Sequence, residues 1–119
     1  MTALECLREA SAAGEHYQRA VNGFIDEFRR AAPAEKARLI AEPIGAPAPL
    51  PGLVAAVVSA LCREAGMAPP DWVGETGSPV PFFAFPAKSF ALRVRLMVES
   101  PPPFRVRNVF VPENFLSRA

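Results

Sequence analysis

The chain has 119 residues, a length that corresponds to one domain with a modest core. Half of the residues are hydrophobic and 21% are charged, which is the balance of a globular protein rather than of a disordered or fibrous one. The formal net charge is only +1, so the chain as a whole has no polybasic or polyacidic character that would attract nucleic acid or a membrane surface.

Charge is nevertheless divided unevenly along the chain. Residues 1–87 hold seven Lys and Arg against ten Asp and Glu, a net of −3, whereas residues 88–119 hold six against two, a net of +4. Such a division can mark a basic binding face, or it can reflect two oppositely charged parts that attract each other within one fold.

The sequence indicates a cytoplasmic protein. The N-terminal segment MTALECLREA is interrupted by charged residues, so we expect no signal peptide. The longest strongly apolar run, residues 50–62, is too short to span a bilayer. Cys6 and Cys62 lie in apolar patterns without a CxxC motif, which favours free buried thiols in a reducing compartment.

Residues 1–42 form an N-terminal helical region. Thr2 and Glu5 fit a capping box, which begins a helix by satisfying free backbone N–H groups. Apolar or small residues then recur at alternating spacings of three and four, at Leu4, Leu7, Ala10, Gly14, Tyr17, Val21, Phe24 and Phe28. This pattern predicts one helix over about residues 3–31, or two helices that break near Gly14. The narrow stripe either pairs two copies as a homodimer or packs on the protein's own core. A second short helix is expected over residues 33–42.

Residues 43–52 contain four prolines and predict an extended connector. Residues 53–119 are expected to form a C-terminal helical core and tail within the same single domain. Its clearest helix is GLVAAVVSALCREAG, with a wide apolar face and Gly66 in place to end it.

Residues 88–100 carry a pattern that fits two structures. Apolar residues alternate with Arg93 and Arg95, as in a strand, but Phe90, Val94 and Met97 also share one face of a helix. We favour a helix, because no other convincing strand is available for pairing. The fold class is therefore mainly α, a single small helical domain with a proline-rich connector and an irregular, partly extended C-terminal segment rich in aromatic residues and arginine.

The sequence contains no recognisable motif for catalysis, metal binding or phosphate binding. The single histidine, His16, lies far in sequence from both cysteines, which does not favour a nucleophile–base pair. The spacing of His, Cys, Asp and Glu does not resemble a metal site, and no glycine-rich loop with a following lysine indicates phosphate binding. We expect a protein that is not an enzyme and that uses no cofactor or metal.

The C-terminal segment PPPFRVRNVFVPENF contains the most distinctive candidates for binding. Its Phe and Val residues are expected to complete the core, with residues 109–111 extended, while Arg105, Arg107 and Asn108 are expected to be exposed. Aromatic and arginine side chains are typical hot spots of protein interfaces. The tentative partner-binding residues are Arg93, Arg95, Arg105, Arg107, Asn108 and Phe110. The alternative is a DNA-binding regulator in which the arginines contact phosphates, although the neighbouring Phe residues favour a protein partner.

Three motifs over roughly residues 53–119 resemble a C-terminal region of small bacterial proteins. They read AGxxxPxW, an aromatic-rich PxF segment, and SPxxFxxRNVFV. The matching positions are Gly66, Pro70, Trp72, Phe82, Pro101, Phe104, Arg107, Asn108 and Phe110. Some of these proteins resemble antitoxin-like or accessory partners of abortive-infection type nucleotidyltransferase toxins. The resemblance implies a non-enzymatic, antitoxin-like partner protein. The chain departs from relatives that carry an N-terminal helix-turn-helix, since no convincing one is found here.

Overall fold

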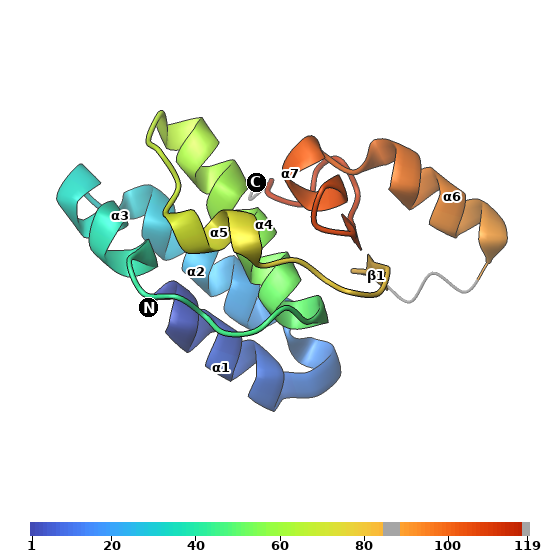
Figure 1. Cartoon of the computed structure of the whole chain (residues 1–119), viewed down its shortest axis with the longest axis horizontal. Coiled ribbons are helices and arrows are strands. Elements are labelled where there is room, and N and C mark those ends of the chain that lie inside the picture. The colour runs from blue at the N-terminus through green and yellow to red at the C-terminus, as the bar shows by residue number, and fades with distance from the viewer. Residues whose placement is uncertain (85–88, 118–119) are drawn as a thin grey trace.

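The chain folds into a helical assembly, described here from a computed structural model that covers residues 1–84 and 89–117. Helices dominate the described residues, which confirms the mainly α fold class (Figure 1). In chain order the elements are α1 (Ala3–Ala13), the 3-10 turn η1 (Gly14–His16), α2 (Gln18–Arg30), α3 (Pro33–Ile40), α4 (Pro49–Ala65), α5 (Asp71–Glu75), β1 (Phe82–Phe83), α6 (Phe90–Glu99), α7 (Pro102–Arg105) and β2 (Val109–Phe110).

The N-terminal stripe forms two helices rather than one. The Thr2 hydroxyl accepts a hydrogen bond from the Glu5 backbone N–H, and the Glu5 carboxylate accepts one from the Thr2 N–H, so the capping box is confirmed. α1 ends at Gly14, whose φ of 60° is a left-handed value that favours glycine. α2 then lies beside α1 (Figure 1).

The apolar stripe of α1 and α2 is used inside the chain. Val21, Phe24 and Phe28 are at most 1% exposed, and they belong to the main hydrophobic core. Packing on the protein's own core is therefore the observed use of this stripe, and a homodimer through it would lack an exposed apolar face.

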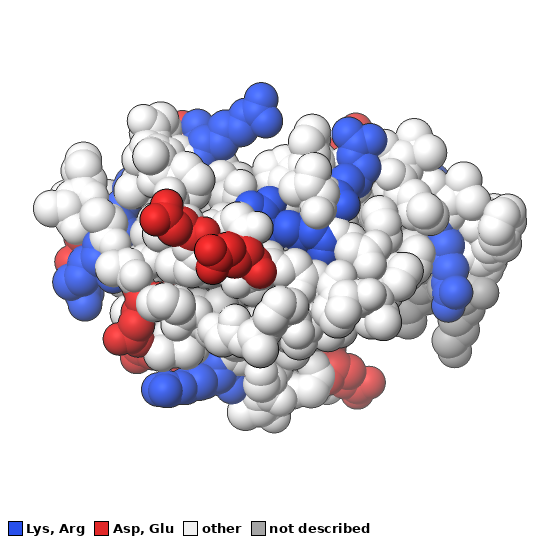
Figure 2. Space-filling model, in the orientation of Figure 1, with Lys and Arg blue, Asp and Glu red and all other residues white. Residues whose placement is uncertain are grey.

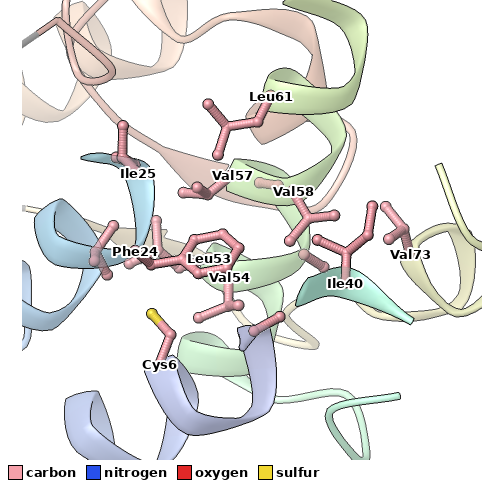
Figure 3. Packing of buried hydrophobic residues seen from close by; sticks show 14 of the residues in the cluster. Cys6, Phe24, Ile25, Ile40, Leu53, Val54, Val57, Val58, Leu61 and Val73 are labelled. Atoms are coloured by element: carbon pink, nitrogen blue, oxygen red, sulfur yellow. The ribbon is translucent and has the colours of Figure 1, made fainter. Parts of the chain in front are cut away.

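Helix α4 lies at the centre of that core. Side chains from α1, α2, α3 and α5 converge on it (Figure 3), among them Cys6, Phe24, Ile40 and Val73. Both cysteines are free and buried, as predicted. α4 ends at Gly66, which has the left-handed φ of 70° expected of a C-terminal cap.

The boundary predicted between the connector and α4 was wrong. The helix begins at Pro49, within the connector predicted over residues 43–52, and it includes Pro51. Proline is tolerated in the first turn of a helix because the N–H groups there have no partner within the helix. Gly52 also permits a close approach, since a Cβ at this position would lie 2.8 Å from the backbone nitrogen of Ser78.

The ambiguous segment forms a helix, which confirms the preferred interpretation for its described part, residues 89–100. The Ser89 hydroxyl caps α6 by accepting from the Leu92 N–H, and the helix ends at Glu99 before Pro101. Position 88 lies outside the described residues.

The assumption that no strands were available to pair was wrong. β1 and β2 form a short parallel pair in which Phe82 lies opposite Val109 and Phe83 lies opposite Phe110. The pair therefore consists of two distant segments of two residues each. β2 confirms the extended conformation predicted around residues 109–111.

Candidate docking site

Helix α6 stands apart from the main core at one end of the molecule (Figure 1). Only Leu96 is buried among its ten residues, and it packs with Phe110 and Phe83 in a small second cluster. The exposed fraction of Phe90 is 82% and that of Val98 is 72%. A helix with this much apolar surface in water is unusual in a monomeric protein, which makes α6 a candidate for an interaction surface.

A groove of about 510 Å³ runs between α6 and the β1–β2 pair, and we call it the α6 groove. Its lining is predominantly apolar and consists of Pro81, Phe83, Phe90, Arg93, Val94, Met97, Asn108 and Phe110. The rings of Phe83 and Phe110 lie 5.2 Å apart between centroids, a contact typical of packed aromatic pairs. The parallel pairing of their two strands fixes this aromatic wall opposite α6.

Arg93 is the charged side chain among the described lining residues of the α6 groove. Its guanidinium carbon lies 5.4 Å from the centroid of the Phe83 ring, within the range of a cation–π contact. The positive charge is therefore held against the aromatic wall. Arg95 is not among the lining residues, and it forms an ion pair with Glu99 one helical turn further along α6.

The prediction that Arg107 is exposed was wrong, because its side chain is half-buried. Its Nε donates to the Val73 carbonyl at 3.2 Å and its Nη1 donates to the Pro103 carbonyl at 2.7 Å. Burial lowers the pKa of the guanidinium from its ordinary value. Arg107 thus connects the C-terminal segment to α5, whereas Arg105, two residues earlier, is exposed.

Asn108 was also predicted to be exposed, and it is partly buried at the rim of the α6 groove. Its backbone φ of 62° is left-handed, a conformation in which asparagine is enriched. Its Nδ2 donates to the Ser78 carbonyl at 3.2 Å. Phe110 is 8% exposed; it packs in the second cluster and also lines the α6 groove.

The structure therefore brings together three of the six predicted residues, Arg93, Asn108 and Phe110, in one groove. Sequence reasoning did not identify Phe90, Val94 and Met97 as binding residues. Their common helical face was visible in the spacing, but the spacing does not tell whether such a face packs inward or remains exposed.

A further hollow and a buried thiol lie elsewhere in the described part of the chain. A hollow of about 500 Å³ beside α1 and α2 has Glu9, His16 and Arg19 among its lining residues, and His16 and its neighbour Glu15 are both largely exposed. Burial raises the pKa of the Cys6 thiol to about 12, which makes it a poor nucleophile. Within residues 1–84 and 89–117, no three His, Cys, Asp or Glu side chains are grouped so that they could hold a metal ion.

None of the described helices combines the length and the apolar character needed to cross a bilayer. Comparison with protein-family models, with curated proteins and with solved structures finds no match to this chain. The resemblance of residues 53–119 to antitoxin-like bacterial proteins thus stays a prediction.

Proposed function

We propose that the protein is a non-catalytic interaction module that docks a protein partner in the α6 groove. The observation that carries the proposal is the exposure of α6: nine of its ten residues are not buried, and Phe90, Met97 and Val98 offer apolar surface to solvent. Covering such a face is favourable at about 25 cal/mol for each Å² of apolar surface removed from water.

The resemblance supports a more specific role. We propose an antitoxin-like or accessory component of a bacterial toxin–antitoxin pair, with a nucleotidyltransferase-type toxin as the partner in the cytoplasm. An antitoxin of this kind works by covering the active site or substrate channel of the toxin. That task requires an apolar surface with a few polar contacts, which the α6 groove offers, rather than catalytic groups of its own.

The alternative of a DNA-binding regulator receives less support. Phosphate binding requires several cations on one accessible face. Arg107 donates to two backbone carbonyls, Arg95 pairs with Glu99, and Arg93 lies over an aromatic ring. Three of the four described C-terminal arginines thus have contacts in three different environments, so their charges do not form one basic surface.

The test is co-purification of the tagged protein from the organism that encodes it. Two matched variants each replace a valine with glutamate. Val94→Glu changes the lining of the α6 groove, whereas Val106→Glu changes an exposed residue of the C-terminal segment that does not line the groove. We expect a stoichiometric protein partner with the wild type and Val106→Glu, and its loss with Val94→Glu. Equal recovery from both variants would contradict the proposed surface. Tight duplex DNA binding with a steep salt dependence would favour the alternative instead.

A further inference from the structure

The two walls of the α6 groove are suited to a helix. On α6, Phe90, Val94 and Met97 follow one another at spacings of four and three, so their side chains form a single row about two turns long. The opposite wall is the Phe83–Phe110 pair, held in register by the strand pairing. A helix that docks into such a groove presents apolar anchors at the same spacings, commonly i, i+3 or i+4, and i+7.

The charge in the described lining of the groove is positive. Arg93 is the only ionisable side chain among its described lining residues, and no Asp or Glu lines it. Residues 89–117 hold four arginines against two glutamates, a net of +2, and one of those glutamates is paired with Arg95. Figure 2 shows that the surface over α6 is largely uncharged, with basic side chains beside it, whereas the prominent acidic cluster lies over other helices. A carboxylate near the apolar anchors of a partner would therefore meet complementary charge.

A second copy of the chain is a poorer occupant of the groove. In a symmetric contact between two α6 grooves, the Arg93 of each copy would face a groove whose described lining holds no carboxylate.

We infer that the α6 groove binds an amphipathic helix of a partner protein, whose apolar anchors fill the space between α6 and the Phe83–Phe110 wall and whose flanking carboxylate meets Arg93. This inference rests on the proposed function and specifies the chemistry of the partner.

The probes are two fluorescein-labelled peptides of about 16 residues, long enough for four helical turns. The acidic probe carries Leu at positions i, i+3, i+4 and i+7 with Glu at the flanking positions, and the basic probe has Lys in place of each Glu. Fluorescence anisotropy is measured with the full chain at about 0.15 M salt, where long-range charge effects are screened beyond ~8 Å.

We expect the acidic probe to bind at least about tenfold more tightly than the basic probe. Arg93→Glu should reverse this preference, because it exchanges the sign of the charge beside Phe83. Val94→Glu should weaken the acidic probe by about tenfold or more, while Val106→Glu should change its affinity by less than about twofold. Circular dichroism and Trp72 fluorescence verify that each variant is folded.

Equal binding of the two probes, or an unchanged preference in Arg93→Glu, would overturn the charge assignment and with it the inference. Failure of the acidic probe to bind at millimolar concentration would overturn it as well. A wild-type dimer in light scattering that Val94→Glu converts to a monomer would assign the groove to a second copy. The proposed function is judged separately, since a natural partner that is lost with Val94→Glu supports it even when the acidic probe fails.

Discussion

Replacing Arg107 with alanine tests whether this arginine is structural. The guanidinium donates to the Val73 carbonyl on α5 and to the Pro103 carbonyl on α7. Hydrogen bonds that involve a charged group contribute about 1.5–3 kcal/mol each. Since the side chain is only half-buried, water can replace part of both bonds. We therefore expect Arg107→Ala to lower the free energy of unfolding by about 2–3 kcal/mol.

The measurement is urea unfolding followed by fluorescence. Trp72 is the single tryptophan, it is 8% exposed, and its indole N–H donates to the Ile40 carbonyl, so its emission reports loss of the core. The matched control is Arg105→Ala, two residues away on an exposed side chain. This control should stay within about 0.5 kcal/mol of the wild type, as is usual for surface substitutions.

Two results would refute the reasoning. If the two alanine variants had the same stability, the carbonyl contacts of Arg107 would contribute nothing measurable. If Arg107→Lys were as stable as the wild type, the forked geometry would be unnecessary, because a lysine ammonium cannot reproduce two divergent guanidinium contacts.

Three further predictions use the same unfolding assay. Gly52→Ala should destabilise the protein by about 1–3 kcal/mol, because its Cβ would meet the rigid backbone at Ser78, whereas Gly74→Ala, with open space around it, should be neutral or stabilising. Ser100→Ala should cost about 1–3 kcal/mol, because its hydroxyl accepts a hydrogen bond from a buried backbone N–H at 2.7 Å. Burial raises the pKa of Tyr17 from 10.0 to about 12, so the unfolded chain releases this proton first and stability is lost as the pH rises from 10 to 12. Between about pH 9 and about pH 11, Tyr17→Phe should therefore lose less stability than the wild type; an equal loss would contradict the assignment.

Much of the fold follows from local signals in the sequence. The capping box at Thr2 and the glycine at position 66 act within one or two turns of the chain, so a single sequence is enough to place them. The start of α4 was misplaced because prolines were taken as breakers, although the first turn accepts them. The pairing of β1 with β2 could not be predicted, since it joins residues 82 and 109 and depends on the whole tertiary structure.

The candidate site also combines features that local sequence predicts with features that depend on tertiary structure. Arg105 and Arg107 are the same residue type two positions apart, yet one is exposed and the other donates to two carbonyls. Their environments depend on where α5 lies relative to α7, and no local pattern encodes that position. Arg93 and Phe110 were selected for their residue types, and the fold places both in one groove that the sequence did not predict.

The ambiguity of the α6 sequence has a physical origin in its surroundings. A helix at the surface of a monomer normally has one apolar stripe, whereas a helix that is apolar on most sides is normally buried. α6 has Leu96 turned towards the second cluster, Met97 in the groove and Val98 in solvent, so three consecutive residues are apolar in three different environments. Such a sequence fits neither a clean helical stripe nor a clean strand alternation. In the proposed complex, Phe90, Val94 and Met97 would form a second buried face beside Leu96, so that two of these three environments would be apolar.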